Sequence, residues 1–335
     1  MRWVAALLML AGLGLASRAQ AASWDCPKPV GIAEPIACGD ADLTVVEAQV
    51  ATALSTASAK LSGLGQARLR ADHAAWRKYL ATLCLGDRQP GGSGVADCLK
   101  QEYDVRRAEL ARAVEVTGGV TLLRNERFDA RPARIAEEAA RPVLTEIAWP
   151  QLDRATGTAQ RRWNEAMEKC AEQLAIPLDR QDPDTDISVD YRIDMVGTAL
   201  IQAVFSRDLY IHGAAHGDDM TVSSLFLLQP ARPLVAGDLF DPARAWQQGL
   251  AELAYLALRD AARQESWRLW PGDAAGLVDL VAEPTRWLLT RDGLALHFDP
   301  YDVGDYAAGM HDVTIPWPAL GTYLQANPAL KLPPR

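Results

Sequence analysis

The stretch "ISVDYRIDM", Ile187–Met195, alternates apolar and polar side chains without interruption. Its odd-numbered positions are apolar or aromatic, and its even-numbered positions are Ser188, Asp190, Arg192 and Asp194. Because successive side chains of a β-strand point to opposite faces of a sheet, this pattern predicts a strand with one buried face. The region around it therefore contains a sheet.

Further strand-like runs follow this stretch along the chain. We predict strands at Thr198–Ser206, Thr221–Leu228, Trp287–Thr290, Leu294–Phe298 and Asp312–Ile315, and helices at Gly157–Leu174 and Pro242–Gln264. Strands joined by short turns such as Arg291–Gly293, with only two long helices, are typical of an α+β domain with a mainly antiparallel sheet. We assign residues 140–335 to this domain and residues 113–139 to a linker or to its start.

Residues 22–112 carry apolar side chains at spacings of three and four, which predicts helices. The three sets are Leu43, Val46, Val50, Leu54, Ala57 and Leu61, then Leu69, His73, Trp76, Leu80 and Leu83, then Leu99, Tyr103, Arg106 and Leu110. The chain is therefore expected to be multi-domain, with a small all-α bundle before the α+β domain. A bundle of this size has a small core, which disulfides would help to stabilise.

Four of the five cysteines, Cys26, Cys38, Cys84 and Cys98, lie in the predicted bundle. An even set in an exported chain predicts two disulfides, for which three connectivities are possible. We favour the local pairs Cys26–Cys38 and Cys84–Cys98, because both bracket loop-like segments. Cys170 is left over on a predicted helix, where we expect a buried free thiol.

The N-terminal segment Met1–Ala21 has the features of a secretory signal. Arg2 precedes an apolar run at Val4–Leu15, and the small residues of "AQA", Ala19–Ala21, end the segment. This order predicts cleavage before Ala22, and the apolar run is too short to cross a bilayer. We therefore expect an exported protein of the periplasm.

Charge is distributed unevenly along the chain. Residues 22–112 contain 11 acidic and 11 basic residues, whereas residues 113–335 contain 32 acidic and 21 basic residues. Affinity for nucleic acid depends mainly on basic side chains, so this balance argues against a nucleic acid partner. An acidic domain favours a cationic partner, although solubility alone also explains it.

The spacing of cysteines and aromatic residues in residues 23–112 resembles the LprI-type lysozyme inhibitor family. The matching residues are Cys26, Glu34, Cys38, Leu43, Trp76, Cys84, Cys98, Leu99, Tyr103, Arg106 and Leu110. The chain departs from that pattern at Glu47, His73 and Leu80, where the family usually has Asp, Gln and Arg. The resemblance implies a helical domain that binds lysozyme.

Residues 140–325 resemble the extracytoplasmic domain of RsiV-type anti-sigma factors, which also accompanies PdaC-type deacetylases. The matching phrases are "AWPQL" (Ala148–Leu152), "GAAH" (Gly213–His216), "LVAGDLF" (Leu234–Phe240), "LTRDGLALHFDPYDVGDYAAG" (Leu289–Gly309) and "VTIPWPAL" (Val313–Leu320). In the RsiV family this domain is a lysozyme receptor. The resemblance implies a binding domain. It does not extend to the cytoplasmic anti-sigma segment and transmembrane helix with which that family signals.

Two acidic or histidine-containing stretches raise the question of a metal ion. His212 and His216 are four residues apart, as zinc ligands on a helix are, but Gly213 and Gly217 favour a turn between strands. The series Asp182, Asp184, Asp186 and Asp190 is similar to a calcium loop, but lacks its Gly and Glu, so we expect a solvated linker instead. We predict no metal and no cofactor.

Residues 1–335 contain no G-x-S-x-G, Walker or H-E-x-x-H motif, so we predict no enzymatic activity. We expect a periplasmic protein that binds, and by steric occlusion inhibits, cationic lysozyme-like muramidases; the alternative is a non-catalytic module that binds peptidoglycan glycan. The partner-binding residues that we predict lie in two loops. They are His212, His216, Asp218 and Asp219 in the first loop, and Asp299, Tyr301, Asp302, Asp305 and Tyr306 in the second.

Overall fold

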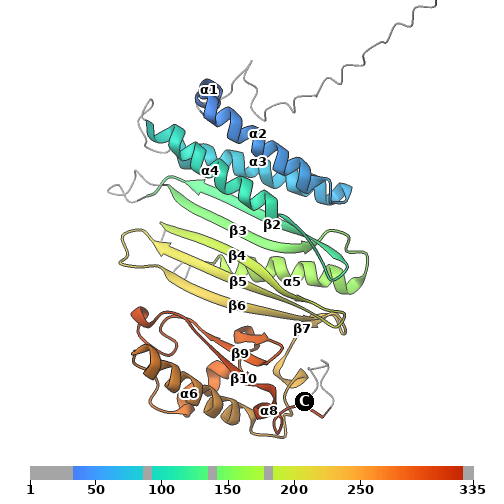
Figure 1. Ribbon diagram of the computed structural model, residues 1–335, viewed down its shortest axis with the longest axis vertical. Coiled ribbons are helices and arrows are strands. Elements are labelled where there is room, and N and C mark those ends of the chain that lie inside the picture. The colour runs from blue at the N-terminus through green and yellow to red at the C-terminus, as the bar shows by residue number, and fades with distance from the viewer. Residues whose placement is uncertain (1–32, 86–92, 135–141, 177–183, 327–335) are drawn as a thin grey trace, which may run out of the picture.

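The computed structural model describes residues 33–85, 93–134, 142–176 and 184–326. Figure 1 shows a helical layer at one end of the molecule, a large sheet in the middle and a smaller set of strands and helices at the other end. The predicted multi-domain fold, helical first and then α+β, is confirmed.

The helical layer consists of α1 (Ala33–Gly39), α2 (Ala41–Ser58), α3 (Gly63–Leu85) and α4 (Ser93–Arg112). α2 begins at Asp40, whose carboxylate accepts hydrogen bonds from two backbone N–H groups of the first turn. The apolar positions that predicted the helices form one core, with Leu43, Leu69 and Leu99 almost fully buried. The spacing of apolar residues therefore gave the correct element type.

One of the two expected disulfides lies wholly within the described residues. Cys84 and Cys98 are bonded, and they join the end of α3 to the first turns of α4. Cys38 is also disulfide-bonded, while Cys26 lies outside the described residues. Cys170 is a free cysteine and is partly buried, as expected.

The central sheet has seven strands in sequence order, and they are antiparallel except for one parallel step between β3 and β4. The strands are β1 (Val114–Thr117), β2 (Val120–Arg131), β3 (Val143–Leu152), β4 (Thr185–Val196), β5 (Leu200–Ile211), β6 (Asp218–Leu227) and β7 (Arg232–Pro233). β4 contains the alternating stretch that predicted it. β1 and β2 lie within residues 113–139, so this part of the predicted linker contributes two strands to the sheet.

α5 (Thr158–Leu174) crosses from β3 to β4 and covers one face of the sheet. Its buried side chains, Trp163, Met167, Ala171 and Leu174, recur every three or four residues and pack on the apolar side chains of β4 and β5. A parallel pair needs such a crossover connection, so the helix and the parallel step occur together.

The expected solvated linker around the aspartate series is wrong for the described members. The Asp184 side chain has no exposed surface, and its carboxylate accepts hydrogen bonds from the Arg131 guanidinium and the Arg134 N–H. Asp186, at the start of β4, accepts a hydrogen bond from the Leu144 N–H at 2.8 Å. These carboxylates hold the ends of the strands together, and Asp182 lies outside the described residues.

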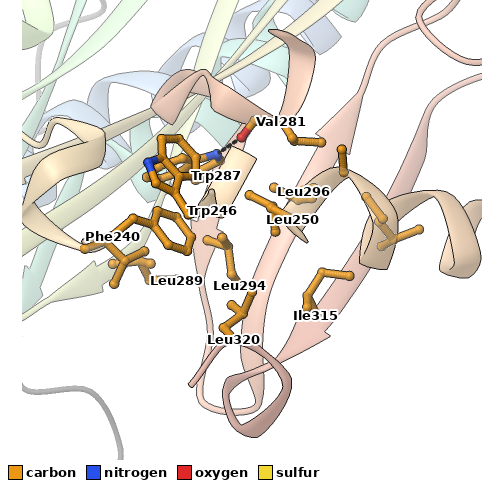
Figure 2. Close-up of a cluster of buried hydrophobic side chains, with 14 of the residues drawn as sticks. Phe240, Trp246, Leu250, Val281, Trp287, Leu289, Leu294, Leu296, Ile315 and Leu320 are labelled. Atoms are coloured by element: carbon orange, nitrogen blue, oxygen red, sulfur yellow. Dashed lines mark hydrogen bonds between the residues drawn. The ribbon is translucent and has the colours of Figure 1, made fainter. Parts of the chain in front are cut away.

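The C-terminal part packs around its own apolar core, shown in Figure 2. It contains α6 (Trp246–Glu265), α7 (Val278–Ala282), the 3-10 turn η4 (Pro284–Arg286) and the antiparallel strands β8 (Trp287–Leu289), β9 (Gly293–Phe298) and β10 (His311–Pro316). η2 (Ala236–Asp238), η3 (Ala274–Leu277), η5 (Tyr306–Ala308) and α8 (Trp317–Leu320) complete it. Phe240 stacks on Trp246, and the Trp287 indole N–H donates to the Val281 carbonyl at 2.9 Å.

Buried charges join the helical layer to the sheet. The Arg106 guanidinium of α4 is fully buried and donates to the Glu126 carboxylate of β2 at 2.6 Å. Glu126 also accepts from Arg124, which in turn pairs with Asp190 of β4. Because an unpaired buried charge is costly, these reciprocal pairs favour one arrangement of helices on strands.

Candidate functional site: an aromatic cluster beside an acidic groove

The structure brings together the two loops that the sequence singled out. The His216 ring, in the turn between β5 and β6, stacks on the Tyr306 ring with 3.8 Å between centroids. The Tyr301 hydroxyl lies 3.3 Å from His216 Nε2. We call His216, Tyr301 and Tyr306 the aromatic cluster. His216 is 85 residues or more from either tyrosine in the sequence, so the fold brings the two loops together.

The backbone of the second loop presents Tyr301 to solvent. Tyr301 has a φ of 72°, a conformation that bulky residues rarely adopt, and 53% of its surface is exposed. Asp305 begins η5, where its carboxylate accepts a hydrogen bond from the Ala308 N–H at 3.0 Å. An exposed aromatic ring held in an unusual backbone conformation is a candidate contact residue.

Two of the predicted contact residues, the buried Asp299 and the partly buried Asp302, hold this loop in place. Asp302 accepts hydrogen bonds from the Arg286 guanidinium and, at 2.7 Å, from the Asp299 N–H. Asp299 accepts from the Thr221 N–H of β6 at 2.8 Å and lies 3.0 Å from His297 Nε2. Asp299 and Asp302 therefore fix the loop to β6 and η4, and have little surface left for a partner.

His212 does not share a surface with His216. Its side chain is almost fully buried, and its Nε2 lies 3.0 Å from the Asp186 carboxylate. His216 is exposed, and its Nδ1 lies 2.8 Å from the Gly217 carbonyl. The expected turn between strands is confirmed, because β5 ends at Ile211 and β6 begins at Asp218. In the part of the chain that is described, no group of three or more His, Cys, Asp or Glu side chains could hold a metal ion.

An acidic groove lies beside the aromatic cluster, on the face of the sheet opposite α5. Its cavity of about 130 Å³ is lined by Ser188, Asp190, Ser206, Arg207, Asp208, Asp219, Met220, Thr221 and Met310. Thr221 connects the two features, because its N–H bonds to Asp299 and its hydroxyl lies 3.9 Å from the Met310 sulfur. Met310 is half exposed at the rim.

Two carboxylates face each other across neighbouring strands in this groove. Asp208 of β5 is the register partner of Asp219 of β6. Burial and the Asp208 carboxylate raise the pKa of Asp219. Within the described ranges no ion pair joins either carboxylate to a cation, whereas Asp218 pairs with Arg207. Like charges opposite each other destabilise a sheet, so a cation from outside would relieve this pair.

The groove continues towards the helical layer. A second cavity, of about 60 Å³, shares Ser188 and Asp190 with the first and reaches Glu109 of α4. Burial raises the pKa of Glu109, as does the nearby Glu126 carboxylate. Sequence reasoning included Asp219 but missed Asp208 and Glu109. The predicted strand Thr198–Ser206 ends two residues before Asp208, whereas β5 continues to Ile211. Extending the predicted strand would have placed Asp208 on its polar face, beside Ser206.

Comparisons with known proteins place a family match in the C-terminal part of the chain. Residues 237–318 match the family model described as "Protein of unknown function (DUF3298)". The C-terminal region thus carries a DUF3298 domain, which begins at η2 and extends to the first residues of α8. A search of curated proteins gave no match.

Similar solved structures come from the same family. A DUF3298 family member from Bacteroides fragilis NCTC 9343 is 16% identical, over 64% of this chain and 97% of that one, with a TM-score of 0.46. A DUF3298 family protein from Pseudomonas aeruginosa PAO1 is 18% identical, over 64% of this chain and 98% of that one, with the same TM-score. Among the described helices, none has the length and apolar character that a membrane crossing requires.

Proposed function

We propose that this protein binds a cationic protein of the lysozyme-like muramidase class and inhibits it by covering its substrate cleft. The observation that carries the proposal is the Asp208 and Asp219 carboxylates, which face each other without an ion pair to a described cation, beside the exposed Tyr301 ring. Aromatic residues supply most of the contact energy in many interfaces, and acidic groups steer a cationic partner. Both resemblances stated above, to LprI-type and RsiV-type proteins, support the same class of partner.

The aromatic cluster and the groove form one contact surface in this proposal. Tyr301 supplies apolar area, and its ring lies against the stacked His216 and Tyr306 rings. The carboxylates of the groove accept Lys or Arg side chains of the partner. Exposed Asp305 adds negative charge at the rim of the loop.

The test compares lysozyme affinity in two variants and a matched control. Asp208→Asn with Asp219→Asn removes the carboxylate pair without leaving a buried cation unpaired. Tyr301→Gly removes the ring and suits the positive φ. Asp279→Asn with Asp292→Asn changes the charge by the same amount at exposed positions outside the groove.

We expect each test variant to lose binding by tenfold or more, about 1.4 kcal/mol, while the melting temperature stays within a few degrees. The control should bind as the wild type does, and high salt should weaken the wild-type complex. If both test variants bind lysozyme as tightly as the control variant does, this surface is excluded. Retention of the protein on peptidoglycan, without affinity for lysozyme, would favour the glycan-binding alternative.

A further inference from the structure

Over most of its length β6 has a neighbouring strand on one side only, and η4 packs close to it. β7 has only two residues and pairs with Phe226 and Leu227 at the end of β6. From Asp218 to Leu225, the only neighbouring strand within the described residues is β5. An open edge presents backbone donors and acceptors that another strand can use.

Two hydrogen bonds show which backbone groups of β6 point outwards. The Thr221 N–H donates to Asp299, and the Leu225 carbonyl accepts from the Leu234 N–H at 2.7 Å. Both bonds lead away from β5. In an antiparallel strand, alternate residues direct both of their backbone groups to the same side. The N–H and carbonyl of Ser223, midway between these residues, therefore also point away from β5.

Ser223 has a second feature that points to a missing partner. Only 5% of the residue is exposed, and its hydroxyl is buried without a hydrogen-bond partner among the described residues. Buried polar groups are nearly always hydrogen-bonded, and leaving one unpaired costs about 1–3 kcal/mol. Ser223 thus offers outward backbone groups at the edge and, on one face of the sheet, a hydroxyl without a partner among the described residues.

A cavity of about 260 Å³ lies along this edge, and we call it the edge slot. One wall is α5, which contributes Ala166, Lys169, Cys170 and Gln173, and the other is η4, which contributes Pro284 and Thr285. Pro233 and Leu234, at the end of β7, also line the slot. At about 30 Å³ for each water molecule, the slot has room for roughly nine waters, or for a few residues of extended chain.

The charge of the edge slot is opposite to that of the acidic groove. Lys169 is the charged residue of its lining, and no ion pair of Lys169 is found within the described ranges. A ligand with a carboxylate near Lys169 would be favoured over one with a cation.

We propose that the edge slot binds an extended acidic peptide, which adds to β6 as a further strand of the sheet. Its backbone pairs with the N–H and carbonyl of Ser223, and a peptide carboxylate pairs with Lys169. Strand addition of this kind obtains affinity from main-chain hydrogen bonds and specificity from side-chain contacts. This site is separate in place and in charge from the lysozyme-binding surface proposed above.

The test uses a displayed library of random octapeptides, selected on the purified chain. We expect enriched peptides to be acidic, and the best of them to bind at least tenfold more weakly to Ser223→Pro. This substitution removes a backbone N–H that points away from β5. Edge strands accept proline at such positions. Lys169→Glu is the second variant, and it should shift the selection towards basic peptides.

Cys170 gives an independent readout, because it is a free thiol in the wall of the slot. A bound peptide should slow the reaction of Cys170 with a soluble thiol reagent at least fivefold, and should not do so in Ser223→Pro. Lysozyme affinity of Ser223→Pro should equal that of the wild type, which separates the two proposals. Peptides that bind both variants as tightly as the wild type, or a library without enrichment, would overturn strand addition at this edge.

Discussion

The aspartates of the second loop have different roles, although they are close in sequence. Asp302 is bonded to Arg286 and to the loop backbone, whereas Asp305 is exposed and caps one turn of η5. Their spacing in the sequence does not separate these roles, because the partner of Asp302 is 16 residues away on η4. Sequence reasoning therefore located the loop but could not distinguish residues that hold it from residues that it presents.

This difference predicts the effect of removing each charge. Asp302→Asn leaves the mostly buried Arg286 without its closest carboxylate, so we expect the free energy of unfolding to fall by about 2–3 kcal/mol. Asp305→Asn should change it by less than about 0.5 kcal/mol, because asparagine also caps helices. Urea unfolding measures both values. Similar stabilities for the two variants would contradict the anchoring role of Asp302.

Among the elements, alternation in the sequence predicted those strands that have one apolar and one polar face. β4 keeps strict alternation because one of its faces borders the groove, whereas β2 and β3 were missed. β2 buries Arg124 and Glu126 between the helical layer and the sheet, so its charges follow pairing partners rather than solvent. A single sequence does not reveal such partners, and alternation fails where both faces are covered.

The attachment of the helices to the sheet predicts a matched pair of glycine variants. Asp153, directly after β3, accepts hydrogen bonds from the N–H and hydroxyl of Ser62 at 2.7 and 2.8 Å. A Cβ on Gly65 would lie 2.0 Å from the Asp153 carboxylate, whereas one on Gly63 would meet nothing within 4 Å. We expect Gly65→Ala to lower the free energy of unfolding by about 1–3 kcal/mol.

Gly63→Ala is the control, since both glycines lie in the first turn of α3. It should leave stability unchanged or raise it slightly, because alanine favours the helix. Denaturant midpoints of the two variants give the comparison, and a loss of equal size in both would show that Asp153 is not involved.

At the scale of the whole molecule, several groups make stability depend on pH in the same direction. Burial raises the pKa of Asp72 to about 6 and that of Glu102 to about 7. Burial alone would lower the pKa of His297, but Asp299 and Asp312 outweigh it and raise the pKa to about 9. Each of these groups binds a proton more tightly in the folded chain than in the unfolded chain.

The sign of the pH effect follows from this preference. A raised pKa stabilises the folded state at low pH, and the contribution disappears as pH rises through the folded value. For His297 the contribution is complete below about pH 6.5, the ordinary pKa of histidine, and is lost by about pH 9. We therefore expect the free energy of unfolding to decrease between pH 6.5 and 9, by on the order of 2 kcal/mol.

Urea unfolding across this range measures the slope, and His297→Gln should flatten it. A titration of the histidine ring by NMR gives an independent value for the pKa. A wild-type stability that rises between pH 6.5 and 9 would contradict the assignment.

The parallel step between β3 and β4 has a mechanical consequence. The two strands are in register over only three residue pairs, from Thr145 with Ile187 to Ile147 with Val189, whereas β4 and β5 pair along nearly their whole length. Tension applied across the long strands β2 to β6 would thus meet the shortest strand pairing in the middle of the sheet. Two halves of the sheet are thus joined by a short strand pairing, and α5, which connects β3 to β4, packs across this joint.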